Sequence, residues 1–130
     1  MGSWCPNCHD EARFLKEWKA NNPDLPVEIV SLSFERYQDS TRSLQILNEF
    51  RKKHEMNWPV VYGGSTRDAQ NSELIDFMGQ LRAYPTLAVF DVDNVVKYVH
   101  TGFYGPATSE YEGFKQEFDL LIKNLTSAGR

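Results

Sequence analysis

The sequence of 130 residues has only two cysteines, no long apolar run and no excess of basic residues. Two cysteines are too few for a small domain that is held together by disulfides. A membrane-spanning helix needs roughly 20 consecutive apolar residues, and no run in the sequence approaches that length. The formal net charge of −4 argues against a nucleic-acid partner, because such proteins usually carry a basic patch.

The remaining composition is typical of a globular domain. Hydrophobic residues make up 41% of the chain and aromatic residues 13%, which is too much apolar material for a disordered protein. A length of 130 residues fits one domain and leaves no room for two ordinary cores, so we assign residues 1–130 to a single domain. The start, MGSWCPNC, lacks the basic and apolar regions of a signal peptide.

Apolar periodicity predicts alternating helices and strands. Helices are predicted over residues 6–21, 41–54, 69–79 and 110–125. Strands are predicted over residues 27–34, 59–62, 86–91 and 95–101. The pair Asp93-Asn94 turns the last two strands into a hairpin, and Gly63-Gly64 is predicted to form a turn. Helices that alternate with strands indicate an α/β fold, to which the hairpin adds antiparallel pairing.

Both cysteines lie in the pentapeptide Trp4-Cys5-Pro6-Asn7-Cys8, at the start of the first predicted helix. At this spacing the two sulfurs can bond, so the pair can cycle between a dithiol and a disulfide. The free N–H groups and the positive dipole end of the helix favour a thiolate at Cys5, which is the attacking species in disulfide exchange. We expect Cys5 to be exposed and to attack, and Cys8 to point inward and to resolve the mixed disulfide.

The pentapeptide resembles the active-site motif of the thioredoxin superfamily. Tyr84-Pro85-Thr86, just before the hairpin, resembles the cis-proline loop of that fold, and the hairpin, Gly102 and the last helix resemble its C-terminal half. The extra helix in the middle of the chain is similar to the TlpA/ResA-like branch of bacterial extracytoplasmic thiol–disulfide oxidoreductases. The resemblance spans residues 3–125 and implies a thioredoxin-like three-layer α/β sandwich with a mixed sheet and a C-terminal β-hairpin.

The resemblance also implies a substrate-binding set. Pro85 matches the cis-proline that holds a substrate strand beside the cysteines, and Tyr84, which precedes it, is expected to contact the substrate. Trp4 is expected to shield the sulfurs and to shape the docking surface. Pro6 is assigned to the substrate-binding residues as well.

Glu11 follows Cys8 by three residues on the same helix face, and the ResA-like branch has a glutamate at this spacing near the resolving cysteine. A partly buried carboxylate has a raised pKa and can pass a proton to or from Cys8. The alternative is that Asp10 and Glu11 only complement the helix dipole, and for Asp10 this alternative is favoured.

The function implied by the resemblance is disulfide exchange with protein substrates and a redox partner protein, without a cofactor or a metal. The location implied is extracytoplasmic, either periplasmic or membrane-anchored in the full-length protein. Pro6-Asn7 between the cysteines lacks the histidine of strongly oxidising relatives, which favours a reductase.

Other functions fit parts of the motif. The letters Cys5-Pro6-Asn7-Cys8-His9 also match a c-type haem attachment site, which would make the chain an electron carrier. Zinc binding by the same residues is disfavoured, because a structural site needs four ligands and no second Cys/His pair exists. A redox-inactive binding module is the third class, with the aromatic, glycine-rich residues 102–108 as its docking loop. We predict that His54 lies at the edge of the core and that His100 points to the surface.

Only Met1-Gly2-Ser3 precede the motif, whereas in the superfamily a hydrophobic strand leads directly into it. We therefore expect the chain to be cut just before the motif and to lack the central strand between residues 27–34 and 86–91. The neighbouring strands would then expose backbone groups. Either these two strands pair with each other, or a second copy covers the exposed edge as a homodimer. We favour an altered, dimer-prone sheet.

Overall fold

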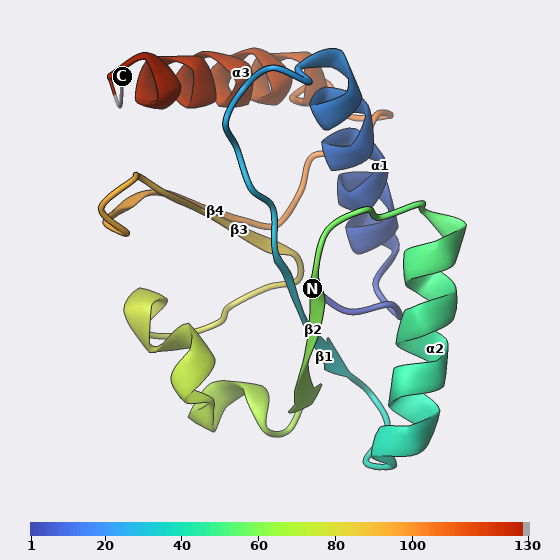
Figure 1. Cartoon of the computed structure of the whole chain (residues 1–130). Helices are drawn as coiled ribbons and strands as arrows, with labels where there is room; N and C mark the ends of the chain where they lie inside the picture. Colours follow the sequence, from blue (N-terminus) through green and yellow to red (C-terminus); the bar gives the residue numbers. More distant parts are fainter. Residues whose placement is uncertain (129–130) are drawn as a thin grey trace.

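The computed structural model describes residues 1–128 and arranges them as helices around two small sheets (Figure 1). The helices are α1 (Pro6–Asn21), α2 (Ser40–Lys53) and α3 (Tyr111–Ala128), with the 3₁₀ helices η1 (Ala69–Asn71) and η2 (Glu73–Met78). The strands are β1 (Ser31–Glu35), β2 (Val60–Ser65), β3 (Thr86–Phe90) and β4 (Val96–Thr101). Within these residues, no helix combines the length and the apolar character that a membrane crossing requires.

The strands form two separate pairs. β1 and β2 are parallel, with Ser31 opposite Val60, and β3 and β4 form an antiparallel hairpin, with Ala88 opposite Val99. Figure 1 shows α3 lying over the hairpin, α2 lying beside β1 and β2, and α1 between them. The predicted α/β class with a late hairpin is confirmed. The alternative in which β1 and β3 pair with each other is wrong, because they belong to different sheets.

The N-terminal residue explains why β1 and β3 stay apart. The amino group of Met1 donates to the carbonyl of Leu32 (2.8 Å), and the N–H of Phe34 donates to the carbonyl of Met1 (2.9 Å). The backbone groups of β1 that could pair with β3 are therefore already occupied. Met1 also packs against the main core.

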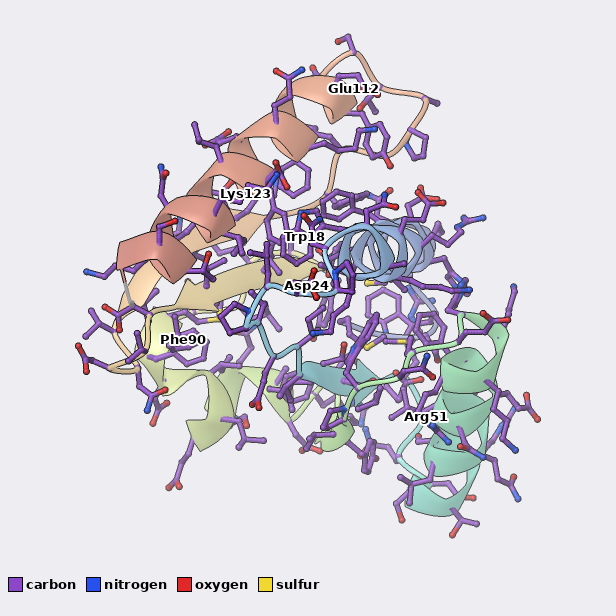
Figure 2. All side chains as sticks on the ribbon, turned by 45° about the horizontal axis from the view of Figure 1, so that its top comes forward. Trp18, Asp24, Arg51, Phe90, Glu112 and Lys123 are labelled. Carbon is purple, nitrogen blue, oxygen red and sulfur yellow. The ribbon has the colours of Figure 1, made fainter. Side chains whose placement is uncertain are left out.

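The core forms where α1 meets α3 and the hairpin. α1 buries one face because its apolar residues recur at helical spacing. The buried residues of this helix are Cys8, Glu11, Ala12, Phe14, Leu15 and Trp18. The ring of Phe14 lies 5.4 Å from that of Phe114 and 5.3 Å from that of Phe118. Trp18 points between α1 and α3 (Figure 2), and its Nε1 donates to Asp119 (3.0 Å). This packing fixes the direction of α1 and thus the place of its N-terminus.

Several predicted boundaries are correct. α1 spans the predicted residues, since Pro6 suits a first helical position and Cys5 caps the helix. α2 and the hairpin agree with the prediction to within a few residues, and the last helix runs three residues further than predicted, to Ala128. The turn at Asp93-Asn94 also forms, with Asn94 in the left-handed region at φ 62°.

Other local predictions are wrong. β1 begins only at Ser31, so the first half of the predicted strand 27–34 is not paired. Gly63-Gly64 lies inside β2 instead of forming a turn, because Gly64 pairs with Phe34 beside a bulge. The predicted helix over 69–79 is split into η1 and η2.

Candidate active site

The two cysteines lie at the N-terminal end of α1 as free thiols. Cys5 is the N-cap, and its Sγ accepts a hydrogen bond from the N–H of Cys8 (3.3 Å). The same sulfur donates to the carbonyl of Tyr84 (3.5 Å). Cys5 is only 5% exposed and Cys8 2% exposed, so the expectation that Cys5 is exposed is wrong. The capping geometry turns its sulfur toward the helix N–H groups and the Tyr84 backbone instead of toward solvent.

The environment of Cys8 keeps it protonated. Burial raises the pKa of Cys8 far above its ordinary value, and the hydrogen bond with Cys5 raises it further. A buried thiol of this kind is a poor nucleophile until a base removes its proton. Cys8 therefore needs a proton acceptor if it is to attack a disulfide.

Glu11 is buried one turn after Cys8, with 8% exposure. Burial raises the pKa of Glu11 from 4.5 to about 7, against the opposing positive charge of the Met1 amino group. The positive charge of the same amino group also opposes the rise in the pKa of Cys8. Among the described residues, Oε2 of Glu11 has no hydrogen-bond partner. Near neutral pH this carboxyl group can therefore both accept and release a proton.

The loop before β3 lies against Cys5. The peptide bond between Tyr84 and Pro85 is cis, as the resemblance implies, and Pro85 is fully buried. The backbone carbonyl of Tyr84 is the group that meets the Cys5 sulfur. The structure thus brings together the cysteine motif and the loop that sequence reasoning assigned to substrate binding.

Trp4 connects three parts of the site. Its Nε1 donates to the carbonyl of Phe34 (2.9 Å), and its ring meets the ring of Tyr84 edge-on, with centroids 4.9 Å apart. The guanidinium group of Arg36 lies over the indole at 4.3 Å. Pro6 is exposed at the first position of α1. Of the predicted substrate-binding residues, Pro6 is thus exposed, Trp4 and Tyr84 are partly buried, and Pro85 is buried.

A buried carboxylate that sequence reasoning missed anchors the segment before the motif. Glu35, which is 2% exposed, accepts hydrogen bonds from the N–H (3.0 Å) and the hydroxyl of Ser3 and from the hydroxyl of Ser33. Alternation along a strand places Ser33 and Glu35 on one face, which is the only local signal for this cluster. The predicted strand ended at residue 34, so that signal was lost.

His9 and His54 form a second interaction that sequence reasoning did not find. Nδ1 of His9 lies 2.7 Å from Nε2 of His54, and Nε2 of His9 lies 2.9 Å from the carbonyl oxygen of Ser3. Both nitrogens of His9 are thus engaged within the protein, and this geometry gives the haem alternative no support. Within residues 1–128, no three His, Cys, Asp or Glu side chains are grouped so that they could hold a metal ion.

The predictions for the other two histidines have opposite outcomes. His54 is 6% exposed and packs on Phe50 at the end of α2, which confirms its place at the edge of the core. The prediction that His100 points to the surface is wrong. Its ring lies 4.9 Å from that of Phe114, because α3 covers this face of the hairpin. Its buried Nε2 has no partner in the described part of the chain.

The glycine-rich loop over residues 102–108 packs against α1. Phe103 lies 5.8 Å from Phe14, and a Cβ atom on Gly105 would come within 2.8 Å of an Asp10 carboxylate oxygen. Asp10 itself pairs with Arg13 at 2.8 Å. The loop therefore contacts α1 at Asp10, two residues after Cys8 and near the end of the helix that carries the cysteines.

Comparison with known proteins adds a family and a fold. The model of the family Redoxin matches residues 1–114. The chain is similar to the crystal structure of a protein described as a thiol:disulfide interchange protein DsbE from Chlorobium tepidum, with a TM-score of 0.63. That match has 16% sequence identity and covers 93% of this chain and 74% of the other. At this identity the likeness shows the fold alone. No curated protein matches the chain in sequence.

Proposed function

Because the chain belongs to the redoxin family of the thioredoxin superfamily, we propose that it is a thiol–disulfide oxidoreductase that acts on protein substrates through Cys5 and Cys8. The family and the thioredoxin-like fold support this type of function in general. The observation that supports the reaction of Cys5 with a protein substrate is the contact between the Cys5 sulfur and the carbonyl of Tyr84, beside the cis-proline Pro85.

The first step is attack by Cys5. Its thiolate attacks one sulfur of a substrate disulfide, and a mixed disulfide forms between Cys5 and the substrate. The second substrate sulfur leaves as a thiolate and takes up a proton from solvent. The backbone N–H of Cys8 donates a hydrogen bond to the Cys5 sulfur, and this bond stabilises the thiolate before attack.

Cys8 completes the reaction. Its thiol gives a proton to the Glu11 carboxylate and attacks the Cys5 sulfur, which forms the Cys5–Cys8 disulfide. The remaining substrate sulfur leaves as a thiolate and is protonated. The protein loses two electrons and the substrate gains two. The raised pKa of Glu11, about 7, supports this role because a base works best when its pKa lies near the operating pH.

The direction and the partners are further parts of the proposal. The absence of a histidine between the cysteines supports a reductase, which needs a redox partner protein to return the Cys5–Cys8 disulfide to the dithiol. The resemblance to the TlpA/ResA-like branch supports an extracytoplasmic location. A homodimer through the open edge of β3 is also proposed, since β3 pairs only with β4 among the described strands.

Single-turnover reduction of a peptide disulfide tests the mechanism. The protein is first reduced with dithiothreitol, freed of it, and mixed with a peptide that contains one intramolecular disulfide. We expect the wild type to convert the peptide to its dithiol and the Cys5→Ser variant to leave it oxidised. Equal rates for the two proteins would refute the proposal. Sedimentation at several protein concentrations tests the homodimer separately, and a monomer at every concentration would exclude it.

A further inference from the structure

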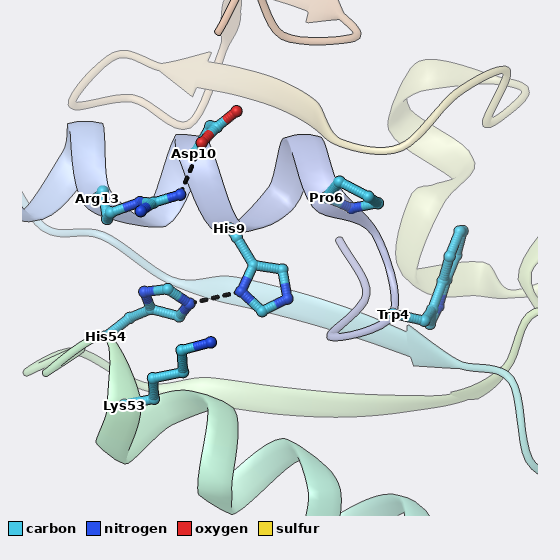
Figure 3. Close-up of a pocket in the computed structure, with 7 residues that line it drawn as sticks. All are labelled: Trp4, Pro6, His9, Asp10, Arg13, Lys53 and His54. Atoms are coloured by element: carbon cyan, nitrogen blue, oxygen red, sulfur yellow. Dashed lines mark hydrogen bonds and ion pairs between the residues drawn. The ribbon is translucent and has the colours of Figure 1, made fainter. Parts of the chain in front are cut away.

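An open pocket of about 420 Å³ lies beside the cysteine motif. Two motif residues, Trp4 and Pro6, form one end of its wall. Figure 3 shows the other lining side chains, which come from α1 and from the end of α2. They are His9, Asp10, Arg13, Lys53 and His54. The pocket therefore adjoins the place where a substrate disulfide would meet Cys5.

The pocket carries positive charge although the whole chain has a net charge of −4. Arg13 and Asp10 form an ion pair at 2.8 Å and so neutralise each other. Lys53 makes no ion pair with the carboxylates of residues 1–128. Its ammonium group is thus a cation that no carboxylate of the described residues pairs with, and Figure 3 shows it reaching toward the histidine pair.

The histidine pair can hold one added proton. Nε2 of His9 faces the carbonyl of Ser3 and must donate to it, so Nδ1 of His9 accepts the hydrogen from Nε2 of His54. A proton added at Nδ1 of His54 leaves both hydrogen bonds intact. A second proton would place two N–H groups against each other at 2.7 Å. The pair therefore offers the pocket one titratable positive charge.

Neighbouring charges favour an anion there. Burial lowers the pKa of His54, and the positive charges of Lys53, Arg13 and Lys16 lower it further. Of the carboxylates nearby, Asp10 is paired with Arg13, and Glu55 is paired with Lys16. An anion that enters the pocket would offset this repulsion.

We propose that this pocket binds an acidic side chain of the disulfide-bearing polypeptide, with Lys53 as its cationic partner beside the His9–His54 pair. The inference rests on the proposed function, because the polypeptide reaches the pocket only if its disulfide is presented to Cys5. Trp4 and Pro6 belong both to the pocket wall and to the motif, so the pocket adjoins the cysteine motif.

Two matched disulfide peptides test the assignment. They differ only in one residue beside a cysteine, which is glutamate in one and lysine in the other. We expect the reduced wild type to react about threefold faster with the glutamate peptide, the size typical of an exposed ion pair. The preference should disappear at about 0.5 M salt, where screening is strong. Lys53→Glu should reverse it. Lys52→Glu, an exposed neighbour outside the pocket with the same charge change, should keep it.

A readout without redox chemistry separates this inference from the proposed function. The same peptides are made with serine in place of cysteine, and the ring resonances of His9 and His54 are followed by NMR. We expect the glutamate peptide to shift them and the lysine peptide to leave them unchanged. If no peptide disulfide is reduced but these shifts appear, the proposed function fails and the pocket assignment stands. Equal reduction rates together with unshifted resonances would overturn the assignment.

Discussion

The sulfur of Cys5 lies 3.5 Å from the carbonyl oxygen of Tyr84, although the two residues are 79 positions apart in the sequence. The rings of Trp4 and Tyr84 meet edge-on beside this contact. Together these contacts join the cysteine motif to the cis-proline loop. In the proposed mechanism, a substrate disulfide at Cys5 touches both segments at once.

The proposed order of attack predicts a trapped intermediate. In a Cys8→Ser variant, Cys5 should still attack a peptide disulfide, but no thiol remains to release the peptide. We expect a stable mixed disulfide between Cys5 and the peptide, visible as a mass increase under non-reducing conditions and absent after dithiothreitol. Cys5→Ser is the control and should form no adduct with the peptide. An equal adduct on the buried Cys8 of that control would contradict the assigned order of attack.

Local patterns predicted the elements that carry the cysteines. Pro6 and the apolar periodicity predicted the bounds of α1, and the turn pair Asp93-Asn94 predicted the hairpin. The cis-proline loop followed from the resemblance of Tyr84-Pro85-Thr86. Each of these signals lies within a few residues of sequence, where backbone preferences and periodicity decide the structure.

Long-range contacts could not be predicted in the same way. Glu35 meets Ser3, and His54 meets His9, only after β1 and α2 have packed beside the N-terminal segment. The prediction of one continuous helix over residues 69–79 was wrong for a related reason. Leu74 and Phe77, which a continuous α-helix over residues 69–79 would turn toward the core, are 52% and 47% exposed, because a 3₁₀ helix has about three residues per turn and so changes the buried face.

Glu11 should make stability depend on pH. Its pKa in the folded chain, about 7, exceeds the ordinary value of 4.5, so the folded state binds the proton more tightly than the unfolded state. The free energy of unfolding should therefore fall as the pH rises from about 4.5 to about 7, by up to about 3 kcal/mol. Glu11→Gln should remove this fall, so the variant should be more stable than the wild type at pH 8. Urea unfolding at pH 5 and pH 8 measures the difference, and Glu17→Gln, exposed on the same helix, is the control. A fall of the same size in Glu11→Gln would show that another group is responsible.

Glu35 should hold the segment before the motif in place. In Glu35→Gln an amide N–H₂ would replace one of the carboxylate oxygens that accept from Ser3 and Ser33. Because a buried polar group without its partner costs about 1–3 kcal/mol, we expect a loss of roughly 2 kcal/mol in the free energy of unfolding. Glu28→Gln, at an exposed position, should change stability by less than about 0.5 kcal/mol. Equal stabilities of the two variants would show that the Glu35 cluster does not anchor the segment.

The second step of disulfide exchange should depend on Glu11. If its carboxylate takes the proton of Cys8, the rate at which the mixed disulfide resolves should rise with pH as Glu11 ionises near pH 7. Glu11→Gln should slow this step about 100-fold and flatten the pH profile in that range, while the first attack by Cys5 keeps its rate. Stopped-flow measurement of the two phases separates the steps, and Glu17→Gln should behave as the wild type. A structural role alone would lower the rate without moving the pH profile, so a variant that retains the wild-type profile would exclude Glu11 as the proton acceptor.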